Sequence, residues 1–376
     1  AASPGDTLLI EATSHQLLEP ITIDKSLILE GDIQNPDTVI LNAPTSGTDR
    51  DVIQVVANHV TIQGLTVQGA RSLKEGAGHV NAGILIGGDA SSLGTEPTGS
   101  TSFSLEGSND WWGIAVSHVA IQHSILTDNS HGIYAFHSQD LNIKHNTISE
   151  NKYNGDSSWE LNGNGILIYS NPTLMDSNNV VNSEAGLQAS SDIEIHHNSI
   201  HDNERFGIEL VHDGGAEYPD AIDINTRILQ NDIYNNGSSM HLTANPNNSA
   251  LFDVFRGISG TGNEKNVIVS ANAIYGHLTS TQSQFAVTSA GIHIKDGENW
   301  TIENNIIEDN TRGIYAYATS SGITVEAGNV IRDNAQGIVF ENSATGTVAA
   351  GITYARNDLT RYVPKGLDPA DFLTLE

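Results

Sequence analysis

Three titratable residues stand at the same position of a short repeated pattern. The pattern is Gly-Ile-x or a variant of it, and its third residue is Glu209, His241 or His293. If successive copies pair as parallel strands about 4.8 Å apart, the three side chains form a line roughly 10 Å long. A carboxylate and two imidazoles in line can take up and release protons near neutral pH. Lys295 and Arg256 could hold an anion beside them, so we predict a catalytic group made of these five residues.

Aromatic residues occupy neighbouring positions of the same pattern. Alternate residues of a strand point to opposite faces, so the third and fifth residues of each copy share the outer face. Long insertions at 151–164, 171–191, 214–222, 244–266 and 277–290 could wall a groove over this face. Aromatic rims and a polar centre suit an extended polysaccharide. The residues predicted to bind it are Tyr134, Phe136, Tyr169, Tyr315, Tyr317, His212, Asp213 and Trp159.

These positions belong to a longer repeat, I-x-x-N-x-I-x-x-N-x-x-G-I, which recurs from about residue 120 to 345. Its first Asn returns at spacings of 52, 33, 41, 33 and 24 residues, at Asn146, Asn198, Asn231, Asn272, Asn305 and Asn329. Apolar residues alternate with period 2 over short runs, which predicts strands, and the repeat predicts a solenoid. Asn tolerates a left-handed corner, and the amides of successive coils can bond in a ladder. We therefore predict an all-β fold, a parallel β-solenoid over residues 1–361, with a C-terminal cap or extension at 362–376.

Composition excludes several classes of function. The 376 residues include 45 acidic and 16 basic side chains, a formal net charge of −29, so no basic stripe is available to bind nucleic acid. The chain has no Cys, which excludes disulfides and thiolate metal sites, and no run of 18 apolar residues that could span a membrane. A strand pattern begins by residue 8. We therefore expect a leader or capping segment to precede Ala1, and the protein to be secreted or periplasmic.

Two groups of residues raise the question of a metal. Hard oxygen ligands suited to Ca²⁺, without an EF-hand spacing, stand at Asp213, Glu217, Asp220 and Asp223. Ca²⁺ is therefore the one cofactor that the sequence suggests. A histidine column beside the Asn positions has no accompanying carboxylates, which favours a solvated surface stack over a metal site, at His123, His145 and His197.

The repeat, together with SPGDTLLIE at 3–11 and EPITIDKSLILEG at 19–31, resembles the right-handed parallel β-helix proteins that carry the carbohydrate-binding and sugar-hydrolase repeat. The resemblance covers most of the chain and implies a pectate-lyase-like fold. Its members include polysaccharide lyases, epimerases, hydrolases, biofilm-matrix lyases and tailspikes, so it specifies the fold more closely than the activity. The DPHD-type motif of mannuronan epimerases does not occur in this chain. With no Cys and only two Met, copper-site assembly, another activity of the group, is disfavoured.

The favoured hypothesis is a secreted lyase that cleaves an acidic, uronate-containing polysaccharide, such as a biofilm exopolysaccharide, by β-elimination. Arg256, Lys295 or a cation would neutralise the substrate carboxylate. His241, His293 or Lys295 would take the proton beside that carboxylate, and a Tyr or His would protonate the leaving oxygen. An acidic polysaccharide is thus the expected partner.

Three alternatives stay open. A glycoside hydrolase would need a second carboxylate near Glu209, for which Asp213 or Asp253 are candidates, although His occupies the neighbouring places in the outward column. A uronate epimerase would begin with the same proton abstraction as a lyase. A carbohydrate-binding adhesin would use the tyrosines without any reaction.

Overall fold

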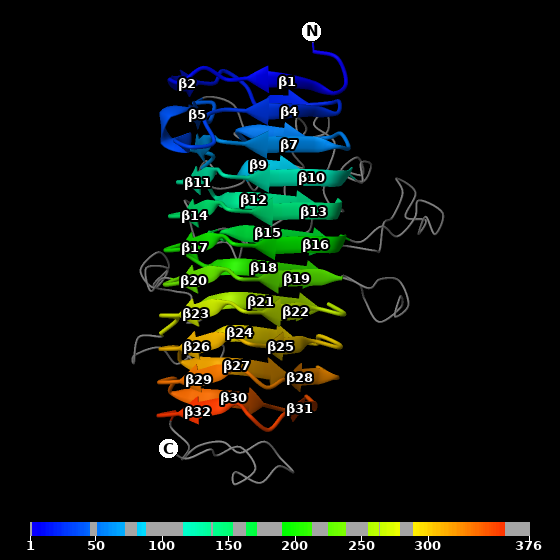
Figure 1. The fold of residues 1–376 in the computed structure, drawn as a ribbon, viewed down its shortest axis with the longest axis vertical. Coiled ribbons are helices and arrows are strands. Elements are labelled where there is room, and N and C mark those ends of the chain that lie inside the picture. Colours follow the sequence, from blue (N-terminus) through cyan, green and yellow to red (C-terminus); the bar gives the residue numbers. More distant parts are fainter. Residues whose placement is uncertain are drawn as a thin grey trace, which may run out of the picture.

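The computed structural model describes residues 2–45, 51–71, 81–87, 116–136, 138–152, 163–170, 190–212, 225–237, 255–262, 264–278 and 289–357. Across these residues the chain winds through three parallel sheets, A, B and C, in the order A, B, C in each coil. The coils stack along the long axis of the molecule, with the N-terminal coil at one end and the last strands at the other (Figure 1). The predicted all-β parallel solenoid is confirmed.

Sheets A and B hold 11 described strands each. Sheet A consists of β1 (Asp6–Leu9), β4 (Leu27–Glu30), β7 (Val60–Gln63), β10 (Val116–Gln122), β13 (Ser138–Lys144), β16 (Ser191–His196), β19 (Thr226–Leu229), β22 (Ile268–Ser270), β25 (Thr301–Glu303), β28 (Ile323–Val325) and β31 (Gly346–Val348). Sheet B consists of β2 (Ser14–Gln16), β5 (Ile40–Asn42), β8 (Thr66–Gln68), β11 (Ile125–Thr127), β14 (Thr147–Ser149), β17 (Ser199–His201), β20 (Asp232–Tyr234), β23 (Ala273–Tyr275), β26 (Ile306–Glu308), β29 (Val330–Arg332) and β32 (Thr353–Ala355).

Sheet C holds 10 described strands and receives the long connections of the chain. They are β3 (Ile21–Ile23), β6 (Ile53–Val55), β9 (Ala82–Ile86), β12 (His131–Phe136), β15 (Ile166–Ser170), β18 (Phe206–His212), β21 (Arg256–Gly262), β24 (Ala290–Lys295), β27 (Arg312–Tyr317) and β30 (Gln336–Phe340). A single turn of 3₁₀ helix, η1 (Pro36–Thr38), lies between sheets A and B. Every internal gap between the described ranges precedes or follows a strand of sheet C, and none lies between a strand of sheet A and the next strand of sheet B. No helix in the described part of the chain is long and apolar enough to cross a membrane.

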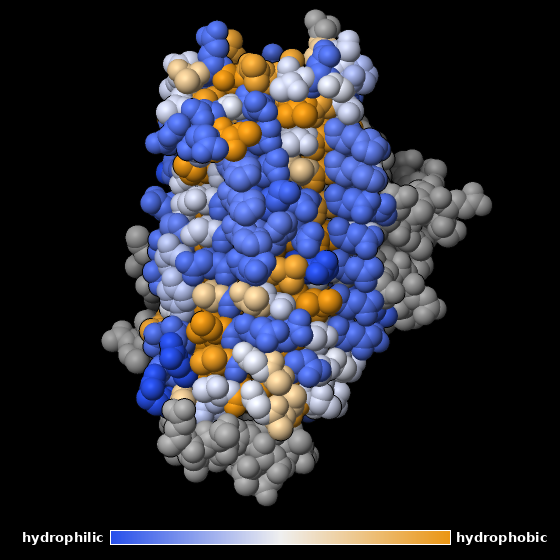
Figure 2. All heavy atoms as spheres, viewed as in Figure 1, coloured by the Kyte–Doolittle hydropathy of each residue, from blue (hydrophilic) through white to orange (hydrophobic). Residues whose placement is uncertain are grey.

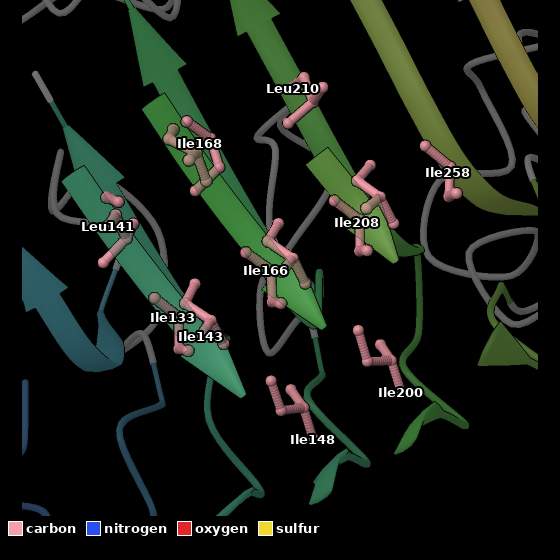
Figure 3. Packing of buried hydrophobic residues seen from close by; sticks show 14 of the residues in the cluster. Ile133, Leu141, Ile143, Ile148, Ile166, Ile168, Ile200, Ile208, Leu210 and Ile258 are labelled. Carbon is pink, nitrogen blue, oxygen red and sulfur yellow. The ribbon is translucent and has the colours of Figure 1, made fainter. Parts of the chain in front are cut away.

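The core is a continuous column of aliphatic side chains inside the solenoid. Alternate residues of each strand point inward, and Ile dominates these positions because its branched side chain fits the spacing of stacked strands. In sheet C, Ile133, Ile166, Ile208 and Ile258 lie one above another and meet Ile148 and Ile200 of sheet B (Figure 3). Outside, polar side chains form columns along the axis over much of the face seen in Figure 2.

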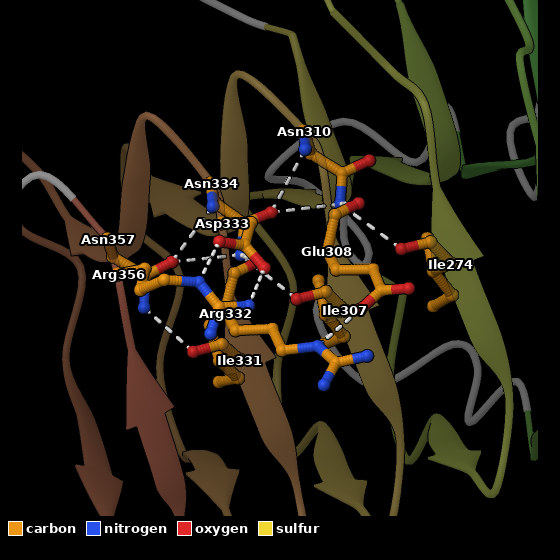
Figure 4. A network of polar contacts seen from close by, with 10 residues as sticks. All are labelled: Ile274, Ile307, Glu308, Asn310, Ile331, Arg332, Asp333, Asn334, Arg356 and Asn357. Carbon is orange, nitrogen blue, oxygen red and sulfur yellow. Dashed lines mark hydrogen bonds and ion pairs between the residues drawn. The ribbon is translucent and has the colours of Figure 1, made fainter. Parts of the chain in front are cut away.

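Two ladders of buried amides run along the corners. The first joins the Asn residues predicted from the sequence repeat: the backbone N–H and Nδ2 of Asn146 both donate to Oδ1 of Asn198, at 3.0 and 3.1 Å, and the pattern continues to Asn329. Nδ2 also donates to a carbonyl of the preceding coil. The second ladder lies between sheets B and C and ends with Asn310, Asn334 and Asn357 (Figure 4). These bonds satisfy polar groups that burial would otherwise leave unpaired.

The left-handed corner residue is not the ladder Asn itself, as the sequence analysis expected, but the residue before it. Positive φ angles occur at His145, His197, Gln230, Ala271 and Asn304, each directly preceding a ladder Asn. The left-handed residue turns the chain from sheet A into sheet B, and the amide of the next residue is buried in the ladder. The preference for Asn at the ladder position is therefore due to hydrogen bonding between coils and not to backbone conformation.

Candidate functional site

The outer face of sheet C presents three columns of side chains. The central column is Tyr134, Leu167, Glu209, Ser259, His293, Tyr315 and Val339. The trailing column, two residues further along each strand, is Phe136, Tyr169, Val211, Thr261, Lys295 and Tyr317. The leading column, at the start of the strands, includes Phe206, Arg256, Ala290, Arg312 and Gln336. Polar and charged side chains gather where β18, β21, β24 and β27 lie side by side.

The central column is buried, although the sequence analysis placed it on an exposed surface. Glu209 is 2% exposed, and Ser259 and His293 are fully buried. In the trailing column, by contrast, Lys295 and Tyr317 are half-buried. Strand periodicity fixes the face to which a side chain points, but not whether that face is covered. Solvent therefore reaches this part of the sheet along the trailing column.

The predicted place of His241 in the central column is wrong. The strand that pairs between β18 and β24 is β21, so Ser259 lies between Glu209 and His293. His241 falls outside the described residues. Because β21 forms this strand, Arg256 occupies its first position on the face of sheet C. The sequence had placed Arg256 in a loop within 244–266. The physical reason is that β21 supplies the full Gly-Ile-x pattern, whereas the segment at residues 239–241 has Ser in place of the Gly.

Glu209 is held by two partners. Nδ2 of Asn164 donates to its Oε2 at 2.7 Å, and Nη1 of Arg205 lies 3.7 Å from the same oxygen. Arg205 in turn stacks over the ring of Phe206, with its Cζ 4.4 Å from the ring centroid. Since Nη1 of Arg205 is buried and has no hydrogen-bond partner, the ion pair leaves a guanidinium donor available on this face.

Arg256 lies one coil further along. Its Nη1 donates to Oγ of Ser259 at 2.8 Å, and its Cζ is 4.8 Å from the centroid of the Phe206 ring. Burial lowers the pKa of Arg256 to about 9, an effect that the Glu209 carboxylate opposes. The guanidinium is therefore still charged at neutral pH, in surroundings that poorly solvate it. Such a group gains from binding an anion.

His293 faces this guanidinium through Ser259. Its Nδ1 lies 3.4 Å from Oγ of Ser259, and its Nε2 is buried without a hydrogen-bond partner within the described residues. Burial lowers the pKa of His293 well below the usual value, and the positive charges of Arg256, Lys295 and Arg312 lower it further. The imidazole is accordingly neutral at physiological pH. One of its nitrogens is then a proton acceptor.

Two tyrosines complete the group, in different ways. The rings of Tyr315 and Tyr317 stack 5.1 Å apart, and their centroids lie 5.7 and 5.3 Å from that of His293. The hydroxyl of Tyr315 donates to Oε2 of Glu341 at 2.5 Å, and Arg312 covers its ring. Burial raises the pKa of both phenols, so both are protonated at neutral pH. Of the two, Tyr317 is the half-buried one, which leaves it better placed to meet a ligand.

The sequence predicted an exposed aromatic rim on this face. The aromatic residues at its N-terminal side are instead buried. Tyr134 is 6%, Phe136 7% and Tyr169 3% exposed, and they pack with Leu85 and Leu167 in a cluster of their own. Phe136 and Tyr169 stack with 5.5 Å between ring centroids. Burial raises the pKa of Tyr134, which therefore stays a neutral, packed phenol. Sugar stacking on these rings would require that they first become accessible.

Several predicted site residues lie outside the described part of the chain. They are Trp159 and Asp213, together with the three other acids suggested for Ca²⁺. His212 ends β18 and its backbone pairs with Ser170 and Gly262, but its side chain is not described. Among the described residues, no group of three or more His, Asp or Glu is placed to hold a metal ion. The histidine column at the first ladder is a surface stack, with rings 5.0 Å apart from His123 to His145 and from His145 to His197.

Six polar or aromatic residues of this face were missed by the sequence analysis: Asn164, Arg205, Phe206, Ser259, Arg312 and Glu341. One signal could have identified some of them. Arg256-Gly257-Ile258 and Arg312-Gly313-Ile314 share the sequence Arg-Gly-Ile, which marks the same position in two coils. What the structure brings together is a guanidinium, a neutral imidazole, an ammonium group and a protonated phenol. Together they can bind an anionic group and transfer protons beside it.

Comparison with known proteins identifies the family. The family description "Right handed beta helix region" matches residues 57–255 and 225–367, well over half of the chain. The periplasmic alginate epimerase AlgG, as a double mutant, is 12% identical with a TM-score of 0.44, over 93% of this chain and 69% of its own. Pectate lyase Pel9A is 13% identical with a TM-score of 0.46, over 93% and 71%. An alginate lyase from a Paenibacillus species is 11% identical with a TM-score of 0.41, over 95% and 91%. No curated protein matches significantly. The chain belongs to the family of right-handed β-helix proteins.

Proposed function

We propose that this protein is a polysaccharide lyase that cleaves an acidic, uronate-containing polysaccharide by β-elimination at the outer face of sheet C. The observation that carries the proposal is His293. It is a buried, neutral imidazole with an unpartnered Nε2, placed between the Arg256 guanidinium and the Tyr317 phenol. A structural histidine in a sheet has no need of such neighbours. Proton abstraction beside a carboxylate, followed by elimination, requires a base, a cation and an acid, which the imidazole, the guanidinium and the phenol would supply.

The distribution of charge supports an anionic substrate despite the net charge of −29. Four basic side chains, Arg205, Arg256, Lys295 and Arg312, come from consecutive coils and meet at this face. The carboxylates among them, Glu209 and Glu341, are already engaged by Asn164 and Arg205 and by Tyr315. Local attraction outweighs the overall charge because exposed charges beyond about 8 Å are largely screened at physiological ionic strength.

The residues of this face would perform three tasks in β-elimination. Arg256 and Lys295 bind the uronate carboxylate and stabilise the negative charge that develops when C5 loses its proton. His293 takes this proton at Nε2. As the C4–O bond breaks and the C4–C5 double bond forms, Tyr317 donates its phenolic proton to the leaving glycosidic oxygen. The imidazolium and the phenolate then exchange a proton and restore the starting state.

Hydrolysis is less well supported by the described residues. A glycoside hydrolase needs two carboxyl groups no more than about 9.5 Å apart. Glu209 and Glu341 belong to coils four steps apart, which corresponds to about 19 Å. The other candidate partners for Glu209, Asp213 and Asp253, lie outside the described residues. An epimerase would share the base but return a proton to the opposite face of C5, and an adhesin would bind without reaction.

The test is the ultraviolet absorbance of the unsaturated uronate during incubation with a panel of uronate polysaccharides, including bacterial exopolysaccharides. A rise that His293→Gln abolishes and His123→Gln leaves intact is the expected result, since His123 is a surface histidine of another corner. New reducing ends without absorbance would instead indicate hydrolysis. Solvent deuterium incorporated at C5 without chain cleavage would indicate an epimerase, and binding alone an adhesin.

Two further parts of the proposal concern the location of the protein and a bound metal ion. We propose a secreted or periplasmic location, where an exopolysaccharide substrate would be met. We also propose Ca²⁺, held by Asp213, Glu217, Asp220 and Asp223, as an aid to carboxylate binding. Removal of Ca²⁺ with a chelator should then raise KM, and added Ca²⁺ should restore it. Unchanged kinetics after chelation would remove Ca²⁺ from the proposal and leave the lyase assignment standing.

A further inference from the structure

Arg205 is a basic residue of this face to which the proposed reaction gives no task. It directly precedes Phe206, the first residue of β18, and its Cζ lies 4.4 Å from the centroid of that ring. Cζ of Arg256, in the next coil, lies 4.8 Å from the same centroid. Arg312, by contrast, donates through Nε to Oε1 of Gln336 at 2.8 Å. Two guanidinium groups therefore meet at one aromatic ring, and the second of them requires an explanation.

The Glu209 carboxylate does not fully account for Arg205. Nη1 of Arg205 lies 3.7 Å from Oε2 of Glu209, which is longer than a hydrogen bond, and that oxygen already accepts one from Nδ2 of Asn164 at 2.7 Å. Nη1 is buried and has no hydrogen-bond partner among the described residues. Burial is the main cause that lowers the pKa of Arg256, and the positive charge of Arg205 adds to it, whereas Glu209 opposes both. Within the described residues the two cations thus share one carboxylate, an imbalance that a bound anion would relieve.

Arg205 is also the member of the pair that solvent reaches. Its side chain is 27% exposed, whereas Arg256 and Glu209 are buried. Phe206 pairs with Arg256 of the next coil, and the strand of His293 follows one coil further. Coils repeat about every 4.8 Å, and each sugar of an extended polysaccharide advances its chain by a similar length. If the reacting uronate of a chain along these columns lies at His293 and Arg256, the sugar next to it meets Arg205.

We propose that Arg205 is a substrate-binding residue, which takes the anionic group of the sugar next to the reacting uronate. The ring of Phe206 supports the guanidinium, and the ion pair with Glu209 directs Nη1 inward, so the opposite edge of the guanidinium is left for a ligand. The site then favours chains whose charged sugars are adjacent. The inference rests on the proposed function for the identity of the reacting sugar. Binding of the second anionic group can be measured without turnover.

The experiment measures the affinity for uronate monomers and trimers by isothermal titration calorimetry. The probes are galacturonate, glucuronate, mannuronate and guluronate, each as the monomer and as the 1,4-linked homotrimer. All proteins carry His293→Gln, which removes the proposed base, so that no trimer is consumed. The variants in this background are Arg205→Gln and the double variant Arg205→Gln/Glu209→Gln. Arg227→Gln is the matched control, because it removes the same charge from an ion pair with Glu194 on sheet A.

In the His293→Gln background at least one trimer should bind more tightly than its monomer. Arg205→Gln should weaken binding of that trimer about tenfold, as expected for one lost hydrogen bond to a charged group. Monomer binding should be unchanged, which also shows that the rest of the site is intact. The double variant removes both charges of the ion pair and should still bind the trimer weakly, because the contact itself is gone. Arg227→Gln should leave both affinities as they are.

The proposal is overturned if no trimer binds more tightly than its monomer. It is also overturned if Arg205→Gln weakens trimer binding no more than monomer binding, or no more than Arg227→Gln does. Recovery of the full trimer affinity in the double variant would be equally decisive, since Arg205 would then only neutralise Glu209. If trimers bind as expected but no polysaccharide yields an unsaturated uronate, the lyase assignment fails and the role of Arg205 in binding stands.

Discussion

His277 should make the stability of the solenoid depend on pH. It replaces Asn at one step of the second ladder and is fully buried. Its Nδ1 lies 2.8 Å from Oδ1 of Asn310, and Nδ2 of Asn236 lies 3.4 Å from its Nε2. A neutral ring with its proton on Nδ1 satisfies both contacts, whereas a protonated ring would place an N–H against the amide N–H of Asn236.

The size of the stability loss at low pH follows from the pKa of His277. Burial lowers the pKa of His277 from 6.5 to about 4, although the bond to Asn310 acts in the opposite direction. Below pH 6.5 the unfolded chain therefore binds a proton that the folded chain excludes. The stability that the neutral His277 ring contributes is therefore intact above pH 6.5 and is lost as the pH falls towards 4. Relative to pH 7.5, the loss is about 2 kcal/mol at pH 5 and about 3 kcal/mol at pH 4.

The assay is urea unfolding of the parent and of His277→Asn at pH 7.5, 6 and 5. The Asn amide can replace the ring in the ladder and does not titrate, so the parent should lose about 2 kcal/mol more than the variant between pH 7.5 and 5. His59→Asn is the matched control, because His59 is exposed and has the positive φ that Asn tolerates. Parallel pH curves for the parent and His277→Asn would refute the reasoning.

Four further substitutions test the fold and the site. Asn272→Ala removes the acceptor of two Asn231 donors inside the first ladder and should lower the free energy of unfolding by about 3 kcal/mol in urea titrations. Gly260→Ala would place a Cβ 2.4 Å from Cζ2 of the fully buried Trp300, so thermal unfolding should show a loss of about 1–3 kcal/mol. Tyr317→Phe should lower kcat about 100-fold in the lyase assay if this phenol is the acid. Tyr315→Phe should cost less, because its hydroxyl is bound to Glu341. Equal kcat losses in the two tyrosine variants would contradict the assignment.

The architecture could be predicted because its determinants recur. The six Asn positions deduced from the repeat are the members of the first ladder, step by step, from Asn146 to Asn329. A buried amide that must bond to its counterpart in the next coil tolerates little variation, so it remains visible even where the spacing changes from 24 to 52 residues. The corner residue before each Asn varies among His, Gln, Ala, Asn and Gly, since only its φ angle is constrained.

The site was harder to predict because the long connections obscure the register of sheet C. Between β20 and β24 the chain offers two segments for one coil, at 239–241 and at 256–262. Both carry an apolar residue followed by a polar one, but only the second begins with Arg-Gly-Ile, as β27 does. Choosing the first segment put His241 where Ser259 stands. Of the five predicted catalytic residues, Glu209, His293, Lys295 and Arg256 nevertheless lie on adjoining coils of one face.

Part of the negative charge has a structural origin, which weakens the objection that the net charge raises to an anionic substrate. Eight acidic residues within the described part of the chain have positive φ: Asp128, Asp140, Glu150, Asp192, Asp202, Asp296, Asp309 and Asp333. Asp tolerates the left-handed region better than most residues, so a solenoid with a corner in every coil accumulates acids there without regard to ligands. Those corner charges are exposed or half-buried, where salt screens them. The guanidinium of Arg256 is buried and is screened far less. A bound anion would therefore interact more strongly with Arg256 than with the distant corner carboxylates.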